Sequence, residues 1–233
     1  MARGYFVTGT DTGVGKTTVS VALIHALRQR GHKVVAMKPV AAGCTWTEDE
    51  LRNDDVVALS TATNVQADPA LVSPYVFAPA IAPHIAAAQA GVEISLDKIV
   101  FAYTALSGLA DVIIVEGVGG FCVPLGEHLD TADLAQALGL PIILVVGMRL
   151  GCLNHALLTA EAIQRRGLKL AGWIANVLES DMPALAENLL TLRRRIPAAY
   201  LGKMLNSRSA PSHNPVDHME WRESPACTQI LGH

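Results

Sequence analysis

The chain has 233 residues, 51% of them hydrophobic and 17% charged, and its formal net charge is −3. This length can bury one sizeable α/β core but leaves little room for a second domain, and the weak negative charge gives no electrostatic reason to bind nucleic acid. The apolar segments are too short to span a membrane and no signal peptide precedes the first apolar run, so we expect one cytoplasmic domain without a membrane partner.

The first predicted element is a glycine-rich loop between a strand and a helix. The apolar run at 5–8 is followed by Gly-Thr-Asp-Thr-Gly-Val-Gly-Lys-Thr-Thr at 9–18. Such a loop holds a phosphate with backbone N–H groups and the helix N-terminus, while Lys16 contacts phosphate and the Thr17 hydroxyl serves Mg²⁺. The usual spacing requires a glycine at position 10, where this chain has Thr10, and Gly9 stands one residue earlier. The pattern predicts a slightly altered nucleoside triphosphate site.

A helix over 16–30 and a strand over 33–37 are predicted next. Lys38 follows that strand directly, and ligands of open α/β sheets bind at the carboxyl edge of the strands. A surface lysine is the alternative, but the expected proximity to the phosphate loop favours a functional one. Asp54 and Asp55 precede the next predicted helix. Either carboxylate is a candidate Mg²⁺ ligand, and the residues alone do not choose between them.

Another buried strand is predicted after a mostly irregular segment over 67–91, a helix from about residue 83, and a helix over 96–106 capped by Ser95. The β-branched run at 112–115 follows Asp111 and is predicted to bring Glu116 to the ligand edge of the sheet. In enzymes with a phosphate loop, an acidic residue at the end of a neighbouring strand holds Mg²⁺. Gly117, Gly119 and Gly120 then allow the backbone to approach a phosphate or a substrate closely.

The last predicted elements continue the alternation. A helix capped by Asp130 or Thr131 runs to 138, a strand over 142–146 breaks at Gly147, and the helix over 155–166 has an amino end that is a second potential anion site. The strand over 170–176 ends in Asn176, either a turn residue or a partner for a base edge. A helix over 183–195 and a strand over 199–203 follow. We assign 1–205 to one α/β domain and 206–233 to a tail of unknown order.

The alternation of strands and helices predicts a doubly wound, mainly parallel sheet with helices on both faces. Two lysines and Mg²⁺ at one edge of this sheet would neutralise a triphosphate, which favours phosphoryl-transfer chemistry. The residues expected at that edge are Lys16, Thr17, Lys38, Asp55 and Glu116.

Seven segments between residues 5 and 203 together resemble the dethiobiotin synthetase family. In chain order they read YFVTGTDTGVGKT, MKPVAAG, LRNDD, YVFAPAIAPH, VEGVGG, VVGMRLGCLNHALLT and GWIAN. The resemblance implies a homodimeric ligase of biotin biosynthesis. It would convert 7,8-diaminopelargonic acid, CO₂ or bicarbonate, and MgATP into dethiobiotin, ADP and phosphate.

The resemblance also implies a role for individual residues. The implied catalytic residues are Lys16, Lys38 and Thr12, and the implied Mg²⁺ ligands are Thr17, Asp55 and Glu116. The implied ATP-binding residues are Gly13, Val14, Gly15, Lys16, Thr17, Thr18, Asp55, Glu116, Gly119 and Asn176. The implied substrate-binding residues are Thr12, Lys38, Ala42 and Gly119, joined by Leu150, Gly151, Cys152 and Asn154 of the other subunit.

Three departures leave room for a paralogous ligase that acts on a related diamine. Ala42 stands where many relatives carry Ser, Gly13 stands where some carry an acidic residue, and Lys203-Met204-Leu205 replaces a segment that leads to a proline. Another alternative is a partitioning-type ATPase switch, which would have a second lysine near position 11, where this chain has Asp11. A small-molecule kinase would need an arginine-rich lid that the sequence does not contain.

Overall fold

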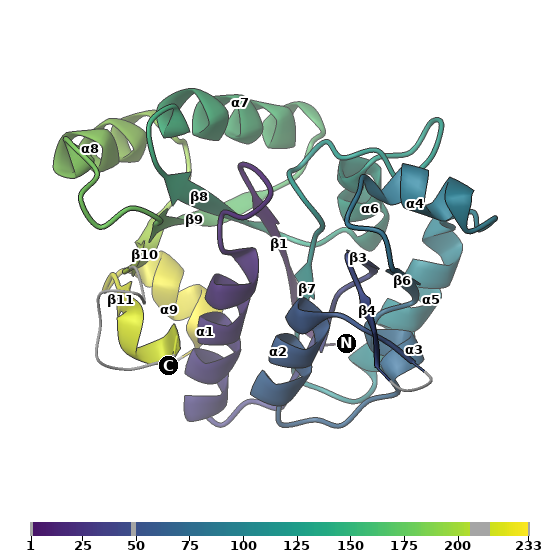
Figure 1. The fold of residues 1–233 in the computed structure, drawn as a ribbon. Coiled ribbons are helices and arrows are strands. Elements are labelled where there is room, and N and C mark those ends of the chain that lie inside the picture. Colours follow the sequence, from purple (N-terminus) through teal and green to yellow (C-terminus); the bar gives the residue numbers. More distant parts are fainter. Residues whose placement is uncertain (1, 48–49, 206–214, 233) are drawn as a thin grey trace.

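The computed structural model describes residues 2–47, 50–205 and 215–232. Its centre is a seven-stranded sheet (Figure 1). In spatial order the strands are β11 (Met219–Trp221), β10 (Tyr200–Met204), β9 (Leu170–Val177), β8 (Ile142–Met148), β1 (Arg3–Gly9), β7 (Val112–Glu116) and β2 (Val34–Met37). All neighbouring pairs are parallel except β10 and β11. The predicted doubly wound, mainly parallel sheet is confirmed.

Helices cover both faces of this sheet (Figure 1). One face packs on α1 (Lys16–Gln29), α2 (Asp54–Ala62) and α9 (Pro225–Leu231), and the other packs on α5 (Leu96–Ser107), α6 (Thr131–Leu138), α7 (Cys152–Arg165) and α8 (Leu185–Arg195). Strand side chains alternate between the two cores. In β7, Val112 and Ile114 face α1, whereas Ile113 and Val115 face α5 and α6.

Several short elements lie between β2 and α5. β3 (Val40–Ala42) pairs in parallel with β6 (Tyr75–Phe77), and β4 (Thr45–Thr47) pairs antiparallel with β5 (Glu50–Arg52). The helices α3 (Pro69–Val72) and α4 (Pro83–Gln89) complete this region. The start of α4 was predicted, but the strands and α3 were not. Elements of three or four residues are too short to show a hydrophobic period.

Two predicted boundaries between β8 and α7 were wrong. β8 continues through Gly147 to Met148, and α7 begins at Cys152 rather than at residue 155. A Cβ on Gly147 would come within 2.8 Å of Val14 Cγ1. This glycine therefore makes room for the phosphate loop and does not end the strand.

The described part of the tail packs against the domain. A short 3₁₀-helix, η2 (Pro215–His218), precedes β11, which extends the sheet beyond β10. On α9, Cys227, Ile230 and Leu231 are buried in the same core as α1. In residues 2–47, 50–205 and 215–232, no helix has the length and apolar character needed to cross a membrane.

Candidate active site

The phosphate loop connects β1 to α1 and is shaped by glycines. Gly13 and Gly15 have φ angles of 73° and 82°, in the left-handed region that favours glycine. A side chain at Gly15 would also collide with Asn176, and one at Gly9 would come within 2.5 Å of Val14 Cγ2. Gly9 is therefore required by packing. Position 10 needs no glycine, because the φ angle of Thr10 is not in the left-handed region, and its N–H bonds to Val145 O of β8 at 3.0 Å.

Lys16 lies in the first turn of α1 and its side chain is directed back over the loop. Its ammonium donates to the Asp11 carbonyl at 3.2 Å, and the residue is only 6% exposed. Burial, together with the positive charge of Lys38, lowers the pKa of Lys16 to about 8. The ammonium is therefore poorly solvated, and an anionic group in the loop would stabilise its charged form.

Strand periodicity places a second lysine and a carboxylate on the α1 side of the sheet. Val112 and Ile114 face α1, so Glu116, two residues further along β7, also faces it. The Lys38 ammonium donates to Glu116 Oε1 at 2.5 Å and to Asp55 Oδ2 at 2.9 Å. Glu116 is fully buried and Lys38 is 3% exposed. The two charges therefore compensate each other away from water.

Asp55 reaches this pair because Asn53 fixes the beginning of α2. The Asn53 side chain accepts from the backbone N–H groups of Asp55 and Val56, which makes it the N-cap, and it donates to Ala42 O at 3.2 Å. Asp54 in the same turn is exposed. Of the two candidate Mg²⁺ ligands predicted from the sequence, Asp55 therefore lies at the site and Asp54 does not.

Thr17 completes the cluster. Its hydroxyl lies 2.8 Å from Asp55 Oδ1 and 2.9 Å from Glu116 Oε1, and it donates its proton to this carboxylate pair. Burial lowers the pKa of Lys38 and raises that of Asp55. The opposite charges and hydrogen bonds outweigh burial, so the pKa of Lys38 is raised and that of Asp55 is lowered. The charged forms of Lys38 and Asp55 are therefore favoured together.

The oxygens of Thr17, Asp55 and Glu116 suit Mg²⁺. Hard cations of this kind take carboxylate and hydroxyl oxygens and keep room for phosphate oxygens and water. Glu116 Oε2 is buried without a hydrogen-bond partner among the described residues. An unpaired buried carboxylate oxygen is costly, and a cation beside it would remove that cost. The donor set therefore fits the predicted metal.

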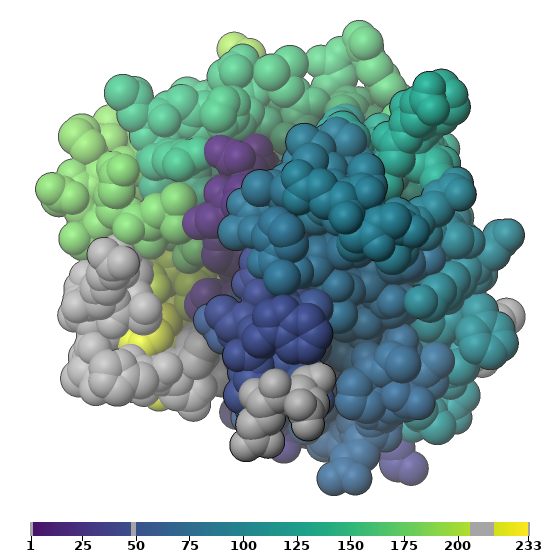
Figure 2. Space-filling view, turned by 45° about the vertical axis from the view of Figure 1, so that its right-hand side comes forward, coloured from purple at the N-terminus to yellow at the C-terminus, as the bar shows by residue number. Residues whose placement is uncertain are grey.

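A cavity of about 700 Å³ opens over this cluster. Figure 2 shows the purple N-terminal segment at the bottom of a hollow between the green and the blue parts of the chain. The predicted residues that line the cavity are Thr12, Gly13, Gly15, Lys16, Thr17, Thr18, Lys38, Ala42, Asp55 and Gly119. Seven further residues line it that were not predicted as site residues: Asn53, Ala80, Ile81, Ala82, Pro83, Val118 and Val123. Of these, Asn53 carries a recognisable signal, since an Asn before two acidic residues is typical of a helix N-cap.

Asn176 lies behind the phosphate loop. Its side-chain amide donates to Val14 O at 2.7 Å, and the residue is 6% exposed. Val14 itself is buried. These two residues therefore support the loop from the sheet side in this structure, and the predicted pairing of Asn176 with a base stays a prediction.

The four predicted substrate residues at the start of α7 lie outside the cavity of their own chain. Leu150 is 97% exposed, Asn154 is exposed and Cys152 is buried. Arg149, which precedes them, forms an ion pair with Asp11 at 2.5 Å. This pair fixes the turn that contains Leu150 and Gly151 relative to the phosphate loop.

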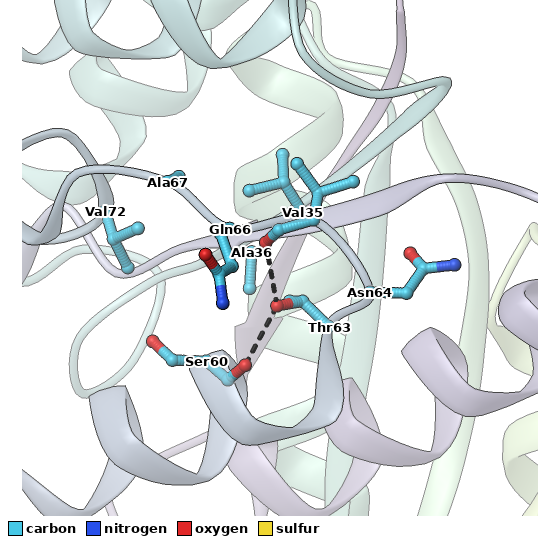
Figure 3. Close-up of a pocket in the computed structure, with 9 residues that line it drawn as sticks. Val35, Ala36, Ser60, Thr63, Asn64, Gln66, Ala67 and Val72 are labelled. Atoms are coloured by element: carbon cyan, nitrogen blue, oxygen red, sulfur yellow. Dashed lines mark hydrogen bonds between the residues drawn. The ribbon is translucent and has the colours of Figure 1, made fainter.

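A second cavity, of about 500 Å³, lies beside the edge strand β2 (Figure 3). Ala36, Ser60 and Gln66 are among its lining residues, and none of the residues that line it is charged. The Thr63 hydroxyl bonds there to the carbonyl oxygens of Ser60 and Val65. Because no charged side chain lines this cavity, it does not suit a triphosphate. The candidate site for phosphoryl transfer is therefore the cavity that Lys16 and Lys38 line.

Comparison with known proteins gives the following. A protein family described as an AAA domain matches residues 3–214. The ATP-dependent dethiobiotin synthetase BioD of Aromatoleum aromaticum is 56% identical over 202 residues, covering 86% of this chain and 89% of the relative. The protein of the same name from Xanthomonas axonopodis pv. citri is 51% identical over 200 residues, with the same coverage. The solved ParA family ATPase from Chlorobium tepidum is similar with a TM-score of 0.59 at 13% identity, covering 100% of both chains, and this likeness shows the fold alone.

Proposed function

This chain belongs to the ATP-dependent dethiobiotin synthetase family, and on that basis we propose how its site works. It is an ATP-dependent cyclo-ligase of biotin biosynthesis that forms dethiobiotin. The observation that supports this function in the structure is one cavity lined by Lys16, Thr17, Lys38 and Asp55. Glu116 is buried behind its lining and is bonded to Thr17 and Lys38. The partitioning-type ATPase considered from the sequence has a similar fold but no comparable sequence identity.

The proposed reaction has three steps. One amine of 7,8-diaminopelargonic acid forms a C–N bond with CO₂ and loses a proton, which gives a carbamate. A carbamate oxygen attacks the γ-phosphorus of ATP, and ADP leaves. The second amine then attacks the carbamate carbon and loses a proton, the C–O bond breaks, phosphate leaves with that oxygen, and the ureido ring closes.

The two lysines fit the charge problem of the second step. A carbamate and a triphosphate are both anions, so they repel each other at reaction distance. Lys16 lies at the phosphate loop and Lys38 lies across the cavity beside Glu116. We assign Lys16 to the β- and γ-phosphates and Lys38 to the carbamate and the transferring phosphoryl group. Thr12 belongs to the loop, lies next to Gly119 and lines the cavity, where it would orient the diamine.

We assign Mg²⁺ to Thr17, Asp55 and Glu116. When bound, the metal neutralises charge on the β- and γ-phosphates. The three residues fit this role because their oxygens already converge and one Glu116 oxygen lacks a partner among the described residues. The backbone of Gly13, Val14, Gly15 and Thr18 would cradle the phosphates, and Asn176 would meet the base.

We further propose a homodimer in which each subunit completes the substrate site of the other. Leu150 is almost fully exposed, and the α7 N-terminus does not line the cavity of its own chain. In a second subunit, the same four residues would meet the carboxylate of the substrate, because helix N-terminal N–H groups favour anions. Cytoplasmic localisation is supported by Cys44, Cys122, Cys152 and Cys227, which are all free thiols.

The reaction is tested by following the carbonate carbon into the product. Purified protein receives MgATP, 7,8-diaminopelargonic acid and either ordinary or ¹³C-labelled bicarbonate. We expect dethiobiotin that carries the label, with one phosphate released for each ring formed. Phosphate release without a labelled ureido product would contradict the proposed ligase.

A further inference from the structure

The segment 117–123 forms one wall of the active-site cavity and is fixed by a buried hydroxyl outside the predicted machinery. Thr131, the first residue of α6, is fully buried. Its hydroxyl accepts from the Val123 N–H at 3.0 Å and donates to Phe121 O at 2.6 Å, with Gly120 O at 3.3 Å. Its own N–H donates to Val123 O at 2.9 Å. One residue thus bonds to backbone groups of Gly120, Phe121 and Val123 in this wall.

The held segment contacts the predicted substrate residues directly. A Cβ on Gly119 would lie 2.8 Å from Val123 Cγ2 and 3.4 Å from Thr12 Oγ1, so Gly119 is packed between these two side chains. Gly119, with φ of 62°, and Val123 both line the cavity. A shift of Val123 would therefore move Gly119 relative to Thr12.

Thr131 is itself held in place by the beginning of α6. Asp130 and Asp133 form a reciprocal capping box around it. The Arg166 guanidinium at the end of α7 bonds to Asp130 Oδ2 at 2.7 Å and to Asp133 Oδ1 at 2.5 Å. These contacts leave the Thr131 hydroxyl little freedom to turn away from the wall.

We propose that Thr131 is a positioning residue for the diamine side of the active site, on the premise that the proposed function is right. Its hydroxyl sets the distance between the wall formed by Gly119 and Val123 and the Thr12 side of the cavity. The proposed phosphate cradle of Gly13, Val14, Gly15 and Thr18 is built separately, from the loop between β1 and α1 and the start of α1, and Gly119 is the only predicted ATP-binding residue among residues 117–123 of the wall. Loss of the hydroxyl should therefore weaken use of the diamine far more than use of MgATP.

The kinetic test compares Thr131→Val, Thr131→Ser and the control Thr104→Val. Valine keeps the shape of threonine but leaves the Val123 N–H and the Phe121 carbonyl unpaired, whereas serine keeps the hydroxyl. The exposed Thr104 donates its hydroxyl to Val100 O within α5, away from the wall. We expect Thr131→Val to raise KM for the diamine about tenfold and KM for MgATP less than about threefold. Thr131→Ser and Thr104→Val should stay near wild type.

Equal rises in the two KM values, an unchanged diamine KM in Thr131→Val, or a serine variant that behaves like the valine variant would overturn the proposal. Amide hydrogen exchange without substrates tests it independently of activity. The Val123 amide of the wild-type protein should exchange slowly, and it should exchange about tenfold faster in Thr131→Val. Fast exchange in the wild type would overturn the role of Thr131 even if the valine variant did not fold. Absence of diamine-dependent phosphate release in the wild type would instead overturn the proposed function.

Discussion

At the scale of single residues, the site depends on a few charges that are withdrawn from water. Lys38 and Glu116 are both buried and bonded to each other, and Lys38 also bonds to Asp55 while Glu116 accepts from Thr17. Such an arrangement contributes little net stability, because desolvation offsets the attraction between the charges. Its value lies in preorganisation, since the charged groups need not rearrange when a phosphoryl group is transferred.

We therefore expect Lys16→Gln and Lys38→Leu each to lower kcat by about a hundredfold or more, because each removes a positive charge from the transferring phosphoryl group. Lys169→Gln is the matched control, since Lys169 is an exposed lysine away from the cavity. Steady-state phosphate release measures the loss, and circular dichroism shows that the fold persists. A near-normal rate in either variant would remove that lysine from the mechanism.

At the scale of elements, the site is set by how strands and helices end. Thr17 and Asp55 lie in the first turns of α1 and α2, and Glu116 is the last residue of β7. The end of α7 and the beginning of α6 are connected in a similar way, by Arg166 and its two aspartates. The proposed catalytic and metal-binding residues thus lie at the ends of helices and strands, and so do the Arg166 contacts that connect α6 to α7.

The Arg166 contacts should stabilise the fold in a pH-dependent way. Burial raises the pKa of Asp133, but hydrogen bonds from Asp130 N–H and Arg166 outweigh it and lower that pKa. Stability from a lowered carboxyl pKa is present above its unfolded value and is lost as the pH falls through the folded value. Because the ions are partly exposed, we expect Arg166→Gln to cost about 1 kcal/mol at pH 7. Urea unfolding should show a smaller difference in the free energy of unfolding between the wild type and Arg166→Gln near pH 3 than at pH 7. An equal difference at the two pH values would contradict the predicted pH dependence.

The tail helix α9 is predicted to contribute to global stability. Ile230 is 3% exposed in the α1 core, whereas Leu190 on α8 is 46% exposed. Ile230→Ala removes buried methyl groups and should lower the free energy of unfolding by about 2 kcal/mol or more. Leu190→Ala should change it by less than about 0.5 kcal/mol. Equal urea midpoints for Ile230→Ala and the wild type would show that α9 is not part of the cooperative core.

The elements with a strong local pattern were predictable from the sequence. The glycines before Lys16 and the β-branched run before Glu116 identified β1, α1 and β7 with the phosphate site. The sequence could not decide whether Asp54 or Asp55 is the candidate Mg²⁺ ligand. That choice required the N-cap geometry of Asn53, which sequence spacing alone does not provide. Val123 lines the cavity in a loop that is bonded to Thr131, eight residues further along the chain, so no local signal indicated it. The strand β11 and the helix α9 depend on packing against β10 and α1, which are distant in sequence.

At the scale of the whole molecule, the proposed phosphate half of the site lies within one chain, whereas four of the proposed substrate residues lie outside the cavity of that chain. The carboxyl ends of β1, β7 and β2 converge on the cavity, while the turn at Leu150 faces solvent. A side chain that is 97% exposed gains nothing in a monomer. We interpret this turn as the part of the molecule that a second subunit uses.

Leu150→Asp should therefore weaken the dimer and raise KM for the diamine, because a charged side chain would be buried in the subunit contact. Leu109→Asp, at a leucine that is 46% exposed, is the control. Analytical ultracentrifugation measures the dissociation constant of each variant. A wild-type protein that sediments as a monomer while turning over normally would refute the shared site.

In the proposed reaction, ATP releases phosphate only when the diamine is present and is converted to dethiobiotin. The most direct measurement is the rate of phosphate release at saturating MgATP and bicarbonate, with and without 7,8-diaminopelargonic acid. We predict that release is close to background without the diamine, and that with it release rises in step with dethiobiotin formation. A rate that is indifferent to the diamine, or that rises instead with DNA, would contradict the assignment and favour an ATPase switch.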